Sequence, residues 1–540
     1  MSRRSDMSNI RLARVLSNGA VLQRGKTIRI WGFSDSKEVT VSFAGKESKT
    51  TVESGRFDVT FPEMAEGGPY EIKAADENGN LVVSSDVMVG DVIIISGQSN
   101  MEFTMENVRQ TYPREWDAPC DKLMRNFKVT ECGVFGHELS EVETGEWKSL
   151  SPESIDAFSA IGYFAAKRLR KKENVAIGLV DLTLGGAPME AFMSRDDLSD
   201  FPEAVAEADK FCDDAYRNSV LKSNETDAQG WLEEFDRTDI GLRDDYKDGE
   251  KIIEMGRDLA IPEFFSDTEL DGFIGCVWLA RRFSVPDEYA GKRALLYFGA
   301  ITDFDWCYIN GVQVGYTDYC YPSRRYEIPE GLIRKGENTI VLRIGVEKGF
   351  GRITPGKLYG IIYGQGVRTT DGFNEGYAGA DHIEPLCGVW KYVIGTKLPR
   401  KKDMVFVNWK ATALYNGMLA PLSGLSVKAF AFYQGESNCG RADEYAALTR
   451  KFVAQIRRMW GEIPYIYVQL PEFNGRMEEI SNDGGKAWRA LMQAQEECRS
   501  IENAHMVKAY GYGELNDLHP QRKAPIGEAI ADIICNLQKA

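Results

Sequence analysis

Residues 92–101, VIIISGQSNM, decide the fold class of this chain. The first four are uninterrupted branched apolar residues, as expected of a strand that is buried on both faces of a parallel sheet. The strand runs directly into a turn, where Gly97 permits a tight bend and Ser99 follows two residues later. In open sheets of parallel strands, ligands bind in the crevice at the carboxyl ends of the strands. The stretch therefore predicts an α/β protein with Ser99 in a candidate functional turn.

Helices and buried strands alternate in two separate parts of the chain, which is the pattern of βαβ units. The first part continues with a helix over residues 157–172 and a strand over 175–182. The second part contains strand 427–433, helix 442–460, strand 465–469, helix 486–501, strand 505–508 and helix 524–537. We therefore predict one α/β domain that is interrupted by an insertion.

Two other regions have the short alternating runs that are typical of antiparallel sheets. Residues 21–88 contain such runs around the hairpin signal Asn78-Gly79, which indicates a small β-sandwich. Residues 272–397 return to this texture, which indicates an inserted all-β domain. Between them, residues 196–254 are acidic and polar, which favours exposed helices that bridge two units.

These patterns divide the chain into four segments. We predict an N-terminal β-sandwich over residues 1–88 and the first part of the α/β domain over 89–260. The inserted β domain then covers 261–400, and the second part of the α/β domain covers 401–540.

Composition argues against several classes of partner. Lys and Arg number 65 against 81 Asp and Glu, and the net charge of −16 disfavours nucleic acid and anionic membranes. The ten cysteines show no metal-type spacing, so we expect buried free thiols. The N-terminus is basic but has no apolar region behind it, so the chain as it stands is expected to be soluble and cytoplasmic. A periplasmic or secreted protein whose signal peptide has been removed would look the same.

Two more predicted strand ends carry groups suited to chemistry. Gly185 and Gly186 follow strand 175–182 and would let backbone N–H groups approach a ligand, as an oxyanion site requires. Gln434, Glu436 and Asn438 follow strand 427–433, and such dense polarity after an apolar run favours a functional role.

The fourth segment, NDLHP at residues 516–520, lies between the last predicted strand and the last helix. Of the four histidines, only His519 has a nearby carboxylate in a loop at a strand end. An imidazole held by an Asp can act as general base toward a serine near neutral pH. Because all four segments follow parallel strands, we predict that they meet in one site.

Taken in order, SGQSNM, LGGAPMEAF, FYQGESN and NDLHP resemble the four blocks of the SGNH hydrolases, in particular the sialate O-acetylesterase-like carbohydrate esterases. LQR at Leu22, GVWKY at Gly388 and YNGMLAPL at Tyr415 are also similar to that family. The resemblance implies a three-layer α/β/α, flavodoxin-like SGNH hydrolase domain. It also implies an N-terminal β-sandwich and an inserted galactose-binding-like β jelly-roll.

The resemblance assigns roles to five residues. Ser99 would be the nucleophile, His519 the general base, and Asp517 the group that orients His519. The oxyanion hole would consist of the N–H groups of Ser99 and Gly186 and the side chain of Asn438. No metal and no organic cofactor is implied.

The orienting carboxylate departs from the pattern of many SGNH hydrolases, which have an Asp three residues before the His, where this chain has Asn516. We choose Asp517, because an Asp two residues before the His also occurs among the acetylesterase relatives. If the stretch is extended, the two side chains point to opposite sides and only one can face His519. The alternative to Asp517 is a Ser-His dyad, with Asn516 or a carboxylate such as Glu514 or Glu436 positioning the ring.

The predicted substrate is an acetylated carbohydrate, with sialic acid, xylan and other glycans left open. Gln434 and Glu436 would support the loop geometry, and Phe192 stands where relatives often have Trp. A lipid or thioester hydrolase and a non-catalytic glycan-binding protein are the alternative functions. Aromatic residues of the inserted domain can stack on sugars, although such residues are more often core: Trp278, Trp306, Tyr308, Tyr319 and Tyr321.

Overall fold

The computed structural model describes residues 10–117, 120–474 and 484–537. Seven of its strands build the central sheet: β8 (Leu81–Gly97), β9 (Met124–Lys128), β10 (Trp147–Ser149), β11 (Ile177–Thr183), β27 (Ala429–Tyr433), β28 (Tyr465–Val468) and β29 (Ala504–Val507). Their order is β10-β9-β11-β8-β27-β28-β29, and all neighbours are parallel except the β10–β9 pair. The predicted α/β class is therefore confirmed, while β9 and β10 were not predicted.

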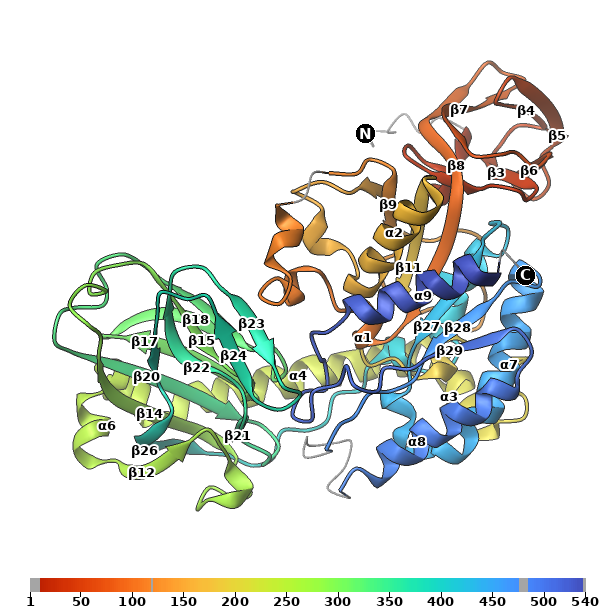
Figure 1. Ribbon diagram of the computed structural model, residues 1–540. Helices are drawn as coiled ribbons and strands as arrows, with labels where there is room; N and C mark the ends of the chain where they lie inside the picture. Colours follow the sequence, from red (N-terminus) through yellow and green to blue (C-terminus); the bar gives the residue numbers. More distant parts are fainter. Residues whose placement is uncertain (1–9, 118–119, 475–483, 538–540) are drawn as a thin grey trace, which may run out of the picture.

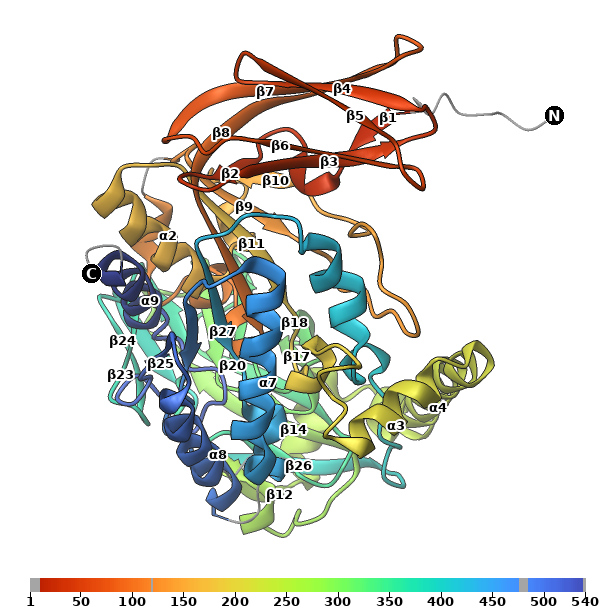
Figure 2. The same cartoon turned by 90° about the vertical axis from the view of Figure 1, so that its right-hand side faces the viewer.

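Helices cover both faces of this sheet (Figures 1 and 2). They are α2 (Ala160–Glu173), α7 (Ala442–Trp460), α8 (Lys486–Glu497) and α9 (Ala524–Leu537). A Cβ atom on Gly162 of α2 would lie 2.8 Å from Ile95, so α2 packs on the face that Ile95 presents. Ile95 pairs with Ala431, and the next residue, Phe432, stacks on Phe452 of α7 at 4.9 Å between ring centroids. Because successive side chains of a strand point to opposite faces, α2 and α7 lie on opposite sides.

Strand β8 is continuous over 17 residues and joins the central sheet to the N-terminal sheets. Its first part pairs antiparallel with β7 (Gly67–Asp76), and its second part pairs parallel with β11 and β27. The other strands before it are β1 (Ile10–Leu12), β2 (Val21–Gln23), β3 (Ile28–Ser34), β4 (Glu38–Phe43), β5 (Lys46–Thr51) and β6 (Arg56–Phe61). The predicted boundary at residue 88 thus falls inside a strand, because the backbone crosses between the sheets without a turn.

Residues 257–397 form a separate β-rich unit beside the α/β unit (Figure 1). Its main strands are β12 (Arg257–Ile261), β14 (Gly275–Ser284), β15 (Ala294–Phe298), β17 (Phe304–Ile309), β18 (Val312–Thr317), β19 (Arg324–Ile328), β20 (Glu337–Val346), β22 (Tyr359–Tyr363), β25 (His382–Pro385) and β26 (Gly388–Lys397). One antiparallel sheet has the order β12-β26-β14-β20-β17-β18 and another has the order β19-β15-β22-β25. Side chains such as Leu279, Leu296 and Ile361 form the core of this unit.

The polar segment before the β-rich unit is helical, as predicted. It contains α3 (Pro202–Phe211), α4 (Asp214–Thr238), α5 (Ile240–Arg243) and α6 (Glu250–Met255). Most of α4 is exposed, but Trp231 and Phe235 near its end are buried and pack on Phe304 of the β-rich unit. Arg343 of β20 also forms a buried ion pair with Asp239 at 2.8 Å. The end of α4 is therefore attached to the outer face of the six-stranded sheet.

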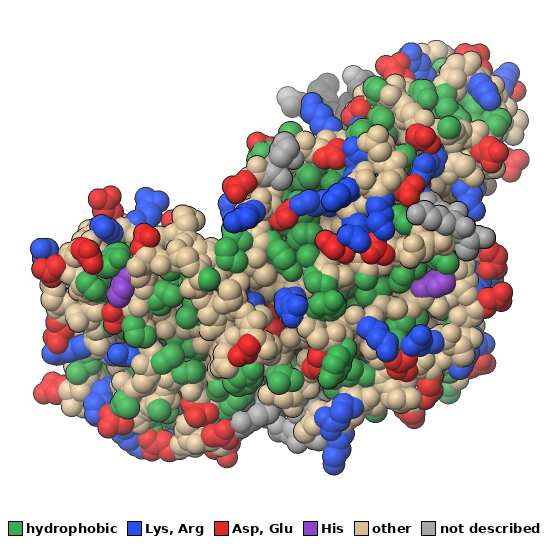
Figure 3. Space-filling view, viewed as in Figure 1, with side chains coloured by type: hydrophobic (Ala, Val, Ile, Leu, Met, Phe, Trp, Pro, Cys, Tyr) green, Lys and Arg blue, Asp and Glu red, His purple; other side chains and the backbone are tan. Residues whose placement is uncertain are grey.

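The surface mixes charges of both signs. Acidic and basic side chains are interspersed on the face seen in Figure 3, so the net negative charge does not gather in one patch there. Within the described ranges, no helix combines the length and the apolar character needed to cross a bilayer. All ten cysteines lie in these ranges as free thiols, and five of them are buried.

Candidate active site

The turn after β8 presents Ser99 at the carboxyl end of the central strand. Gly97 has φ +125°, and a Cβ atom there would lie 2.2 Å from the carbonyl oxygen of Tyr433, so only glycine fits. Ser99 begins the short helix α1 (Ser99–Glu102). The first N–H groups of a helix have no partner inside it, so the Ser99 N–H points out of α1.

His519 meets Ser99 although the two residues are 420 positions apart in the chain. Its Nε2 lies 2.7 Å from the Ser99 Oγ. The imidazole stacks on the ring of Phe103 at 5.7 Å, and Tyr321 of the β-rich unit contacts it edge-on at 5.0 Å. Burial, and then the charge of Lys523, lower the pKa of His519 to about 3. The ring is therefore neutral at physiological pH and can accept a proton.

Asp517 contacts the backbone of His519 rather than its ring. Its Oδ1 accepts a hydrogen bond from the His519 N–H at 2.7 Å, and its Oδ2 lies 2.7 Å from the Lys357 ammonium. Among the described residues, the Nδ1 atom of His519 has no hydrogen-bond partner. The geometry therefore joins the Asp517 carboxylate to the backbone of His519 and not to its imidazole.

The stretch before His519 is a turn and not an extended segment. The Asp517 N–H donates to the Glu514 carbonyl at 3.0 Å, and these two residues form an isolated bridge. The side chain of Asn516 donates to the carbonyl oxygens of Pro355 and Phe373, both in the β-rich unit. Asn516 and Asp517 therefore both contact the β-rich unit. Their side chains were expected to oppose each other only in an extended segment, and the turn does not meet that condition.

Gly185 and Gly186 lie beside the serine. A Cβ atom on Gly185 would lie 3.6 Å from the Ser99 Cβ, and its N–H donates to the Glu102 carboxylate at 2.7 Å. Gly186 has φ +73°, and a Cβ atom there would lie 2.0 Å from the indole of Trp409. In the described part of the chain, the Gly186 N–H has no hydrogen-bond partner. This N–H is available to a ligand next to Ser99.

Asn438 is fully buried, and its amide is held in one orientation. Its Oδ1 accepts hydrogen bonds from the Met189 N–H at 3.0 Å and from Gln434 Nε2 at 2.6 Å. Its Nδ2 donates one hydrogen to Glu190 at 2.9 Å, which leaves the second amide hydrogen for another acceptor. Gln434 thus helps to hold the Asn438 amide in place.

Glu436 belongs to a buried polar chain next to Ser99. Its Oε1 accepts a hydrogen bond from Asn100 Nδ2 at 2.6 Å, and Asn100 also donates to the Leu518 carbonyl at 3.0 Å. The ammonium of Lys523 donates to Asn100 Oδ1. Burial raises the pKa of Glu436 to about 7 and lowers the pKa of Lys523 to about 7. This chain ties the residue after Ser99 to the loop of His519.

Aromatic rings that are exposed or partly exposed lie near Gly186 and His519. Trp409 covers Gly186 and stacks on Phe406 at 3.9 Å between centroids. Tyr319 is about half exposed and packs edge-on against Tyr321 at 5.1 Å. Sequence reasoning did not single out Trp409 or Phe406, which come from the segment that follows the β-rich unit.

Other aromatic residues that the sequence analysis named pack in the protein core. Trp278 and Tyr308 are buried and stack on each other at 6.1 Å. Phe192 is fully buried and packs against Phe432, so it is not part of the surface around Ser99. Trp306 stacks on the guanidinium of Arg343 at 4.3 Å.

Glu102 and the residues around His519 were missed for different reasons. Glu102 lies three residues after Ser99 on the same helix, a spacing that could have identified it. Phe103 carries no such local signal, because only the packing of distant segments brings it to the imidazole. Lys523 lies four residues after His519, but its complete burial is a result of the fold.

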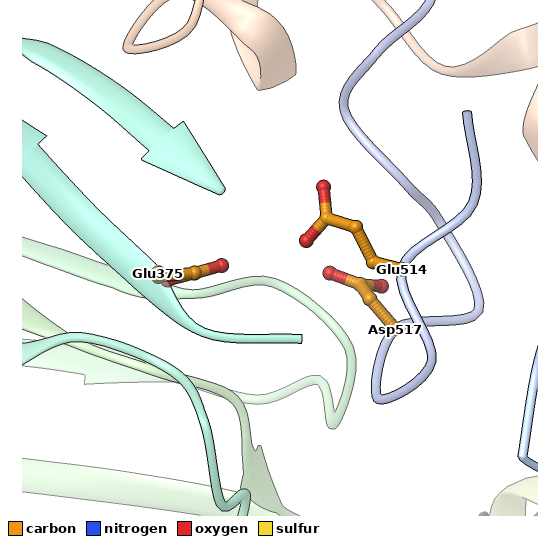
Figure 4. Close-up of side chains that lie close together, drawn as sticks. All are labelled: Glu375, Glu514 and Asp517. Carbon is orange, nitrogen blue, oxygen red and sulfur yellow. The ribbon is translucent and has the colours of Figure 1, made fainter. Parts of the chain in front are cut away.

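Three carboxylates form a cluster, two from the loop that carries His519 and one from the β-rich unit (Figure 4). One oxygen each of Glu375, Glu514 and Asp517 lies within 4.8 Å of the others. The Lys357 ammonium lies between them, at 3.0, 3.1 and 2.7 Å respectively. The position that a metal ion would need is therefore filled by this ammonium group.

Part of the chain matches a known protein family. Residues 395–534 match the family described as carbohydrate esterase, sialic acid-specific acetylesterase. The matched segment contains Asn438, Asp517 and His519, whereas Ser99 and Gly186 lie before it.

Two curated relatives are sialate O-acetylesterases. The rat protein is 30% identical over 204 residues, which cover 34% of this chain and 38% of the relative. The human protein is 26% identical over 211 residues, which cover 35% of this chain and 40% of the relative. The matches thus span about two fifths of the length of these relatives.

The fold has a solved counterpart over nearly its whole length. The crystal structure of a carbohydrate acetylesterase from Xanthomonas citri matches with a TM-score of 0.54 and 20% identity, covering 97% of this chain and 74% of that chain. At this identity, the likeness shows a shared fold. Over residues 395–534, the chain is therefore similar to the sialic acid-specific acetylesterases among the carbohydrate esterases.

Proposed function

We propose that this protein is a serine esterase that removes O-acetyl groups from carbohydrates through an acetyl-enzyme on Ser99. The observation that carries the proposal is the 2.7 Å contact between Ser99 Oγ and His519 Nε2 at the carboxyl end of β8. Burial lowers the pKa of His519 to about 3, so the imidazole is neutral, which is the form that can accept the serine proton.

The reaction takes two half-reactions. His519 accepts the Ser99 proton while the Oγ attacks the acetyl carbonyl carbon, and the carbonyl oxygen becomes an oxyanion. The N–H groups of Ser99 and Gly186 and the second amide hydrogen of Asn438 stabilise this charge. His519 returns the proton to the departing sugar oxygen. It then activates a water molecule that attacks the acetyl-enzyme and releases acetate.

Asp517 has a modified role in this proposal. It positions His519 through the backbone N–H, whereas the rings of Phe103 and Tyr321 fix the plane of the imidazole by packing. The expected pairing of Asp517 with the imidazole itself has no hydrogen bond to support it among the described contacts.

We also propose an assignment of the three domains. A parallel sheet with helices on both faces is consistent with a three-layer SGNH domain formed by residues 89–260 and 401–540. The two larger antiparallel sheets of the β-rich unit support an inserted jelly-roll over 261–400. The remaining residues, 1–88, would be the β-sandwich, with β8 shared between the first two segments.

A carbohydrate is favoured over a lipid or thioester by the aromatic rings around Ser99. Phe406 is 45% exposed and Tyr319 is 53% exposed, although such rings are usually buried. Exposed flat rings pack on the apolar faces of sugar rings, and Trp409 and Phe406 present such a surface beside Gly186. An acetylated sialic acid or another acetylated glycan is therefore the proposed substrate class.

The experiment compares the wild type with Ser99→Ala in hydrolysis of p-nitrophenyl acetate. We expect kcat to fall by about 10⁴-fold or more, because Ser99 supplies the attacking atom, while the Tm stays close to that of the wild type. Ser219→Ala, an exposed serine on α4, is the matched control and should retain full activity. A Ser99→Ala variant that kept a tenth of the wild-type kcat would show that Ser99 is not the nucleophile.

Acetylated sialosides and acetylated xylo-oligosaccharides then define the substrate. Release of acetate, together with an acetylated Ser99 peptide in rapid-quench mass spectrometry, is the expected result. Binding of these glycans without acetate release would instead support a glycan-binding protein on a hydrolase scaffold.

A further inference from the structure

The β-rich unit holds the loop that carries His519. This loop runs from β29 to α9, and its Leu515 N–H donates to the Gly372 carbonyl at 2.7 Å. Asn516 Nδ2 donates to the carbonyl oxygens of Pro355 and Phe373, at 2.6 and 2.9 Å. The β-rich unit thus holds the backbone of Leu515 and the side chain of Asn516, although more than a hundred residues separate it from this loop in the sequence.

Lys357 makes the charged part of this contact. It lies between β21 (Arg352–Ile353) and β22, and its side chain is completely buried. Its Nζ lies 2.7 Å from Asp517 and 3.1 Å from Glu514 on the catalytic loop, and 3.0 Å from Glu375 on β24 (Glu375–Ala378). Figure 4 shows these three carboxylates pointing toward one another from the two units.

Arg368 is a second buried cation in the cluster. It lies on β23 (Val367–Thr370) and contacts both Glu375 and Glu514. Although burial alone would lower the pKa of Lys357, the carboxylates of Asp517, Glu375 and Glu514 raise it well above its ordinary value. Lys357 is therefore charged, and two cations balance two of the three carboxylates.

Of the two cations, Lys357 is the one that touches Asp517. Arg368 contacts Glu375 and Glu514, and its contacts would survive the loss of Lys357. The Asp517 carboxylate would not keep a cationic partner, because its other hydrogen bond comes from the neutral His519 N–H. A buried carboxylate without a counter-charge takes up a proton or moves toward water.

We infer that Lys357 is a positioning residue for the general base. The inference rests on the proposed esterase function. Its ammonium holds the Asp517 carboxylate, the carboxylate holds the His519 N–H, and the His519 imidazole contacts Ser99, with 2.7 Å at each of these steps. The β-rich unit is thereby part of the catalytic apparatus.

The first test is the kinetics of Lys357→Met on p-nitrophenyl acetate. We expect kcat to fall by about 100-fold, because a small misplacement of a catalytic group costs that much, while KM changes by less than about twofold, since Lys357 does not face the substrate. Lys391→Met is the matched control, because it removes a lysine of the same unit that pairs with Asp258 in β12. This control should keep the wild-type kcat.

A double-mutant cycle separates positioning from general destabilisation. Asp517→Asn keeps an oxygen that accepts the His519 N–H but removes the charge that Lys357 holds. If Lys357 acts through Asp517, the double variant is no slower than the slower single variant. Losses that multiply, or a Lys357→Met variant with wild-type kcat, would overturn the inference.

A measurement on the imidazole keeps the inference testable if the esterase function fails or a variant has low activity. The chain has four histidines, so selective ¹⁵N-histidine labelling gives a sparse spectrum, in which His519→Gln identifies the His519 signals. We expect these signals to shift in Asp517→Asn and Lys357→Met and to stay in place in Lys391→Met. If Lys357→Met does not fold, the shift of the His519 signals in Asp517→Asn is the deciding measurement. Unchanged His519 signals would overturn the inference, whereas an inactive wild type would overturn only the esterase function.

Discussion

Replacing Lys523 by Met should move the acid limb of the pH–activity profile toward neutral pH. Lys523 is fully buried, and its ammonium donates to Asn100, the residue after Ser99. After burial itself, this positive charge is the cause that lowers the pKa of His519 to about 3. A cation disfavours the protonation of a neighbouring imidazole, so removing it raises the pKa of His519. Burial still keeps that pKa below its ordinary value.

The ring of Phe103 sets a limit on the separation of the two groups. Lys523 Nζ lies 5.0 Å from the centroid of the Phe103 ring, and the centroid of the His519 ring lies 5.7 Å from that same point. The ammonium and the imidazole are thus at most about 11 Å apart, and Coulomb's law at an effective dielectric constant of ~20 then gives at least roughly 1.5 kcal/mol. This energy corresponds to a shift of about one pKa unit or more.

The charges in the acid range support this sign. The pKa of Lys523 is about 7, so Lys523 is cationic throughout the acid limb. The pKa of Glu436 is also about 7, so its carboxyl is neutral there and does not cancel the cation. The removal of Lys523 therefore changes the local charge by one unit in the range where His519 takes up its proton.

The assay is kcat/KM for p-nitrophenyl acetate as a function of pH below neutrality. The kcat/KM reached at the plateau of the profile measures the effect of losing the hydrogen bond to Asn100. The pH of the acid limb measures the effect of the Lys523 charge on the pKa of His519. Lys49→Met is the control, because it removes an exposed lysine of β5 that pairs with Glu38. The electrostatic reasoning would be refuted if Lys523→Met is folded and its acid limb lies at the same pH as that of the wild type.

Two further predictions concern the oxyanion hole and the core of the β-rich unit. Asn438→Ala should lower kcat by about 10²–10³-fold with a smaller change in KM, because the hydrogen bond that the Asn438 amide donates strengthens as the oxyanion forms. A change in KM alone would make Asn438 a substrate-binding group. Arg324→Met should lower the free energy of unfolding by about 3–5 kcal/mol, because Asp305 is left buried without its partner. The two side chains are fully buried and pair at 2.5 Å. Urea unfolding measures the loss, and a change below about 1 kcal/mol would contradict this reading.

The four polar segments could be predicted because each follows a strand with its own local signature. Strands such as β8 and β27 are continuous apolar runs, and parallel strands present their carboxyl ends at one edge. The sequence positions of Ser99 and His519 were therefore enough to expect them in one crevice. The same reasoning could not foresee that residues 514–517 form a turn, since that bend depends on hydrogen bonds to Gly372 and Pro355.

The sequence by itself determined the α/β class, the interruption by a β-rich unit and the identity of the serine, histidine and asparagine at the strand ends. These features depend on periodicity and on residue type, which are local properties of the chain. Only the tertiary structure decided what surrounds His519: the rings of Phe103 and Tyr321, and the cations Lys523 and Lys357. A buried lysine has no periodic signature, and its charge is stable in the interior only when folding brings distant carboxylates or amides to it.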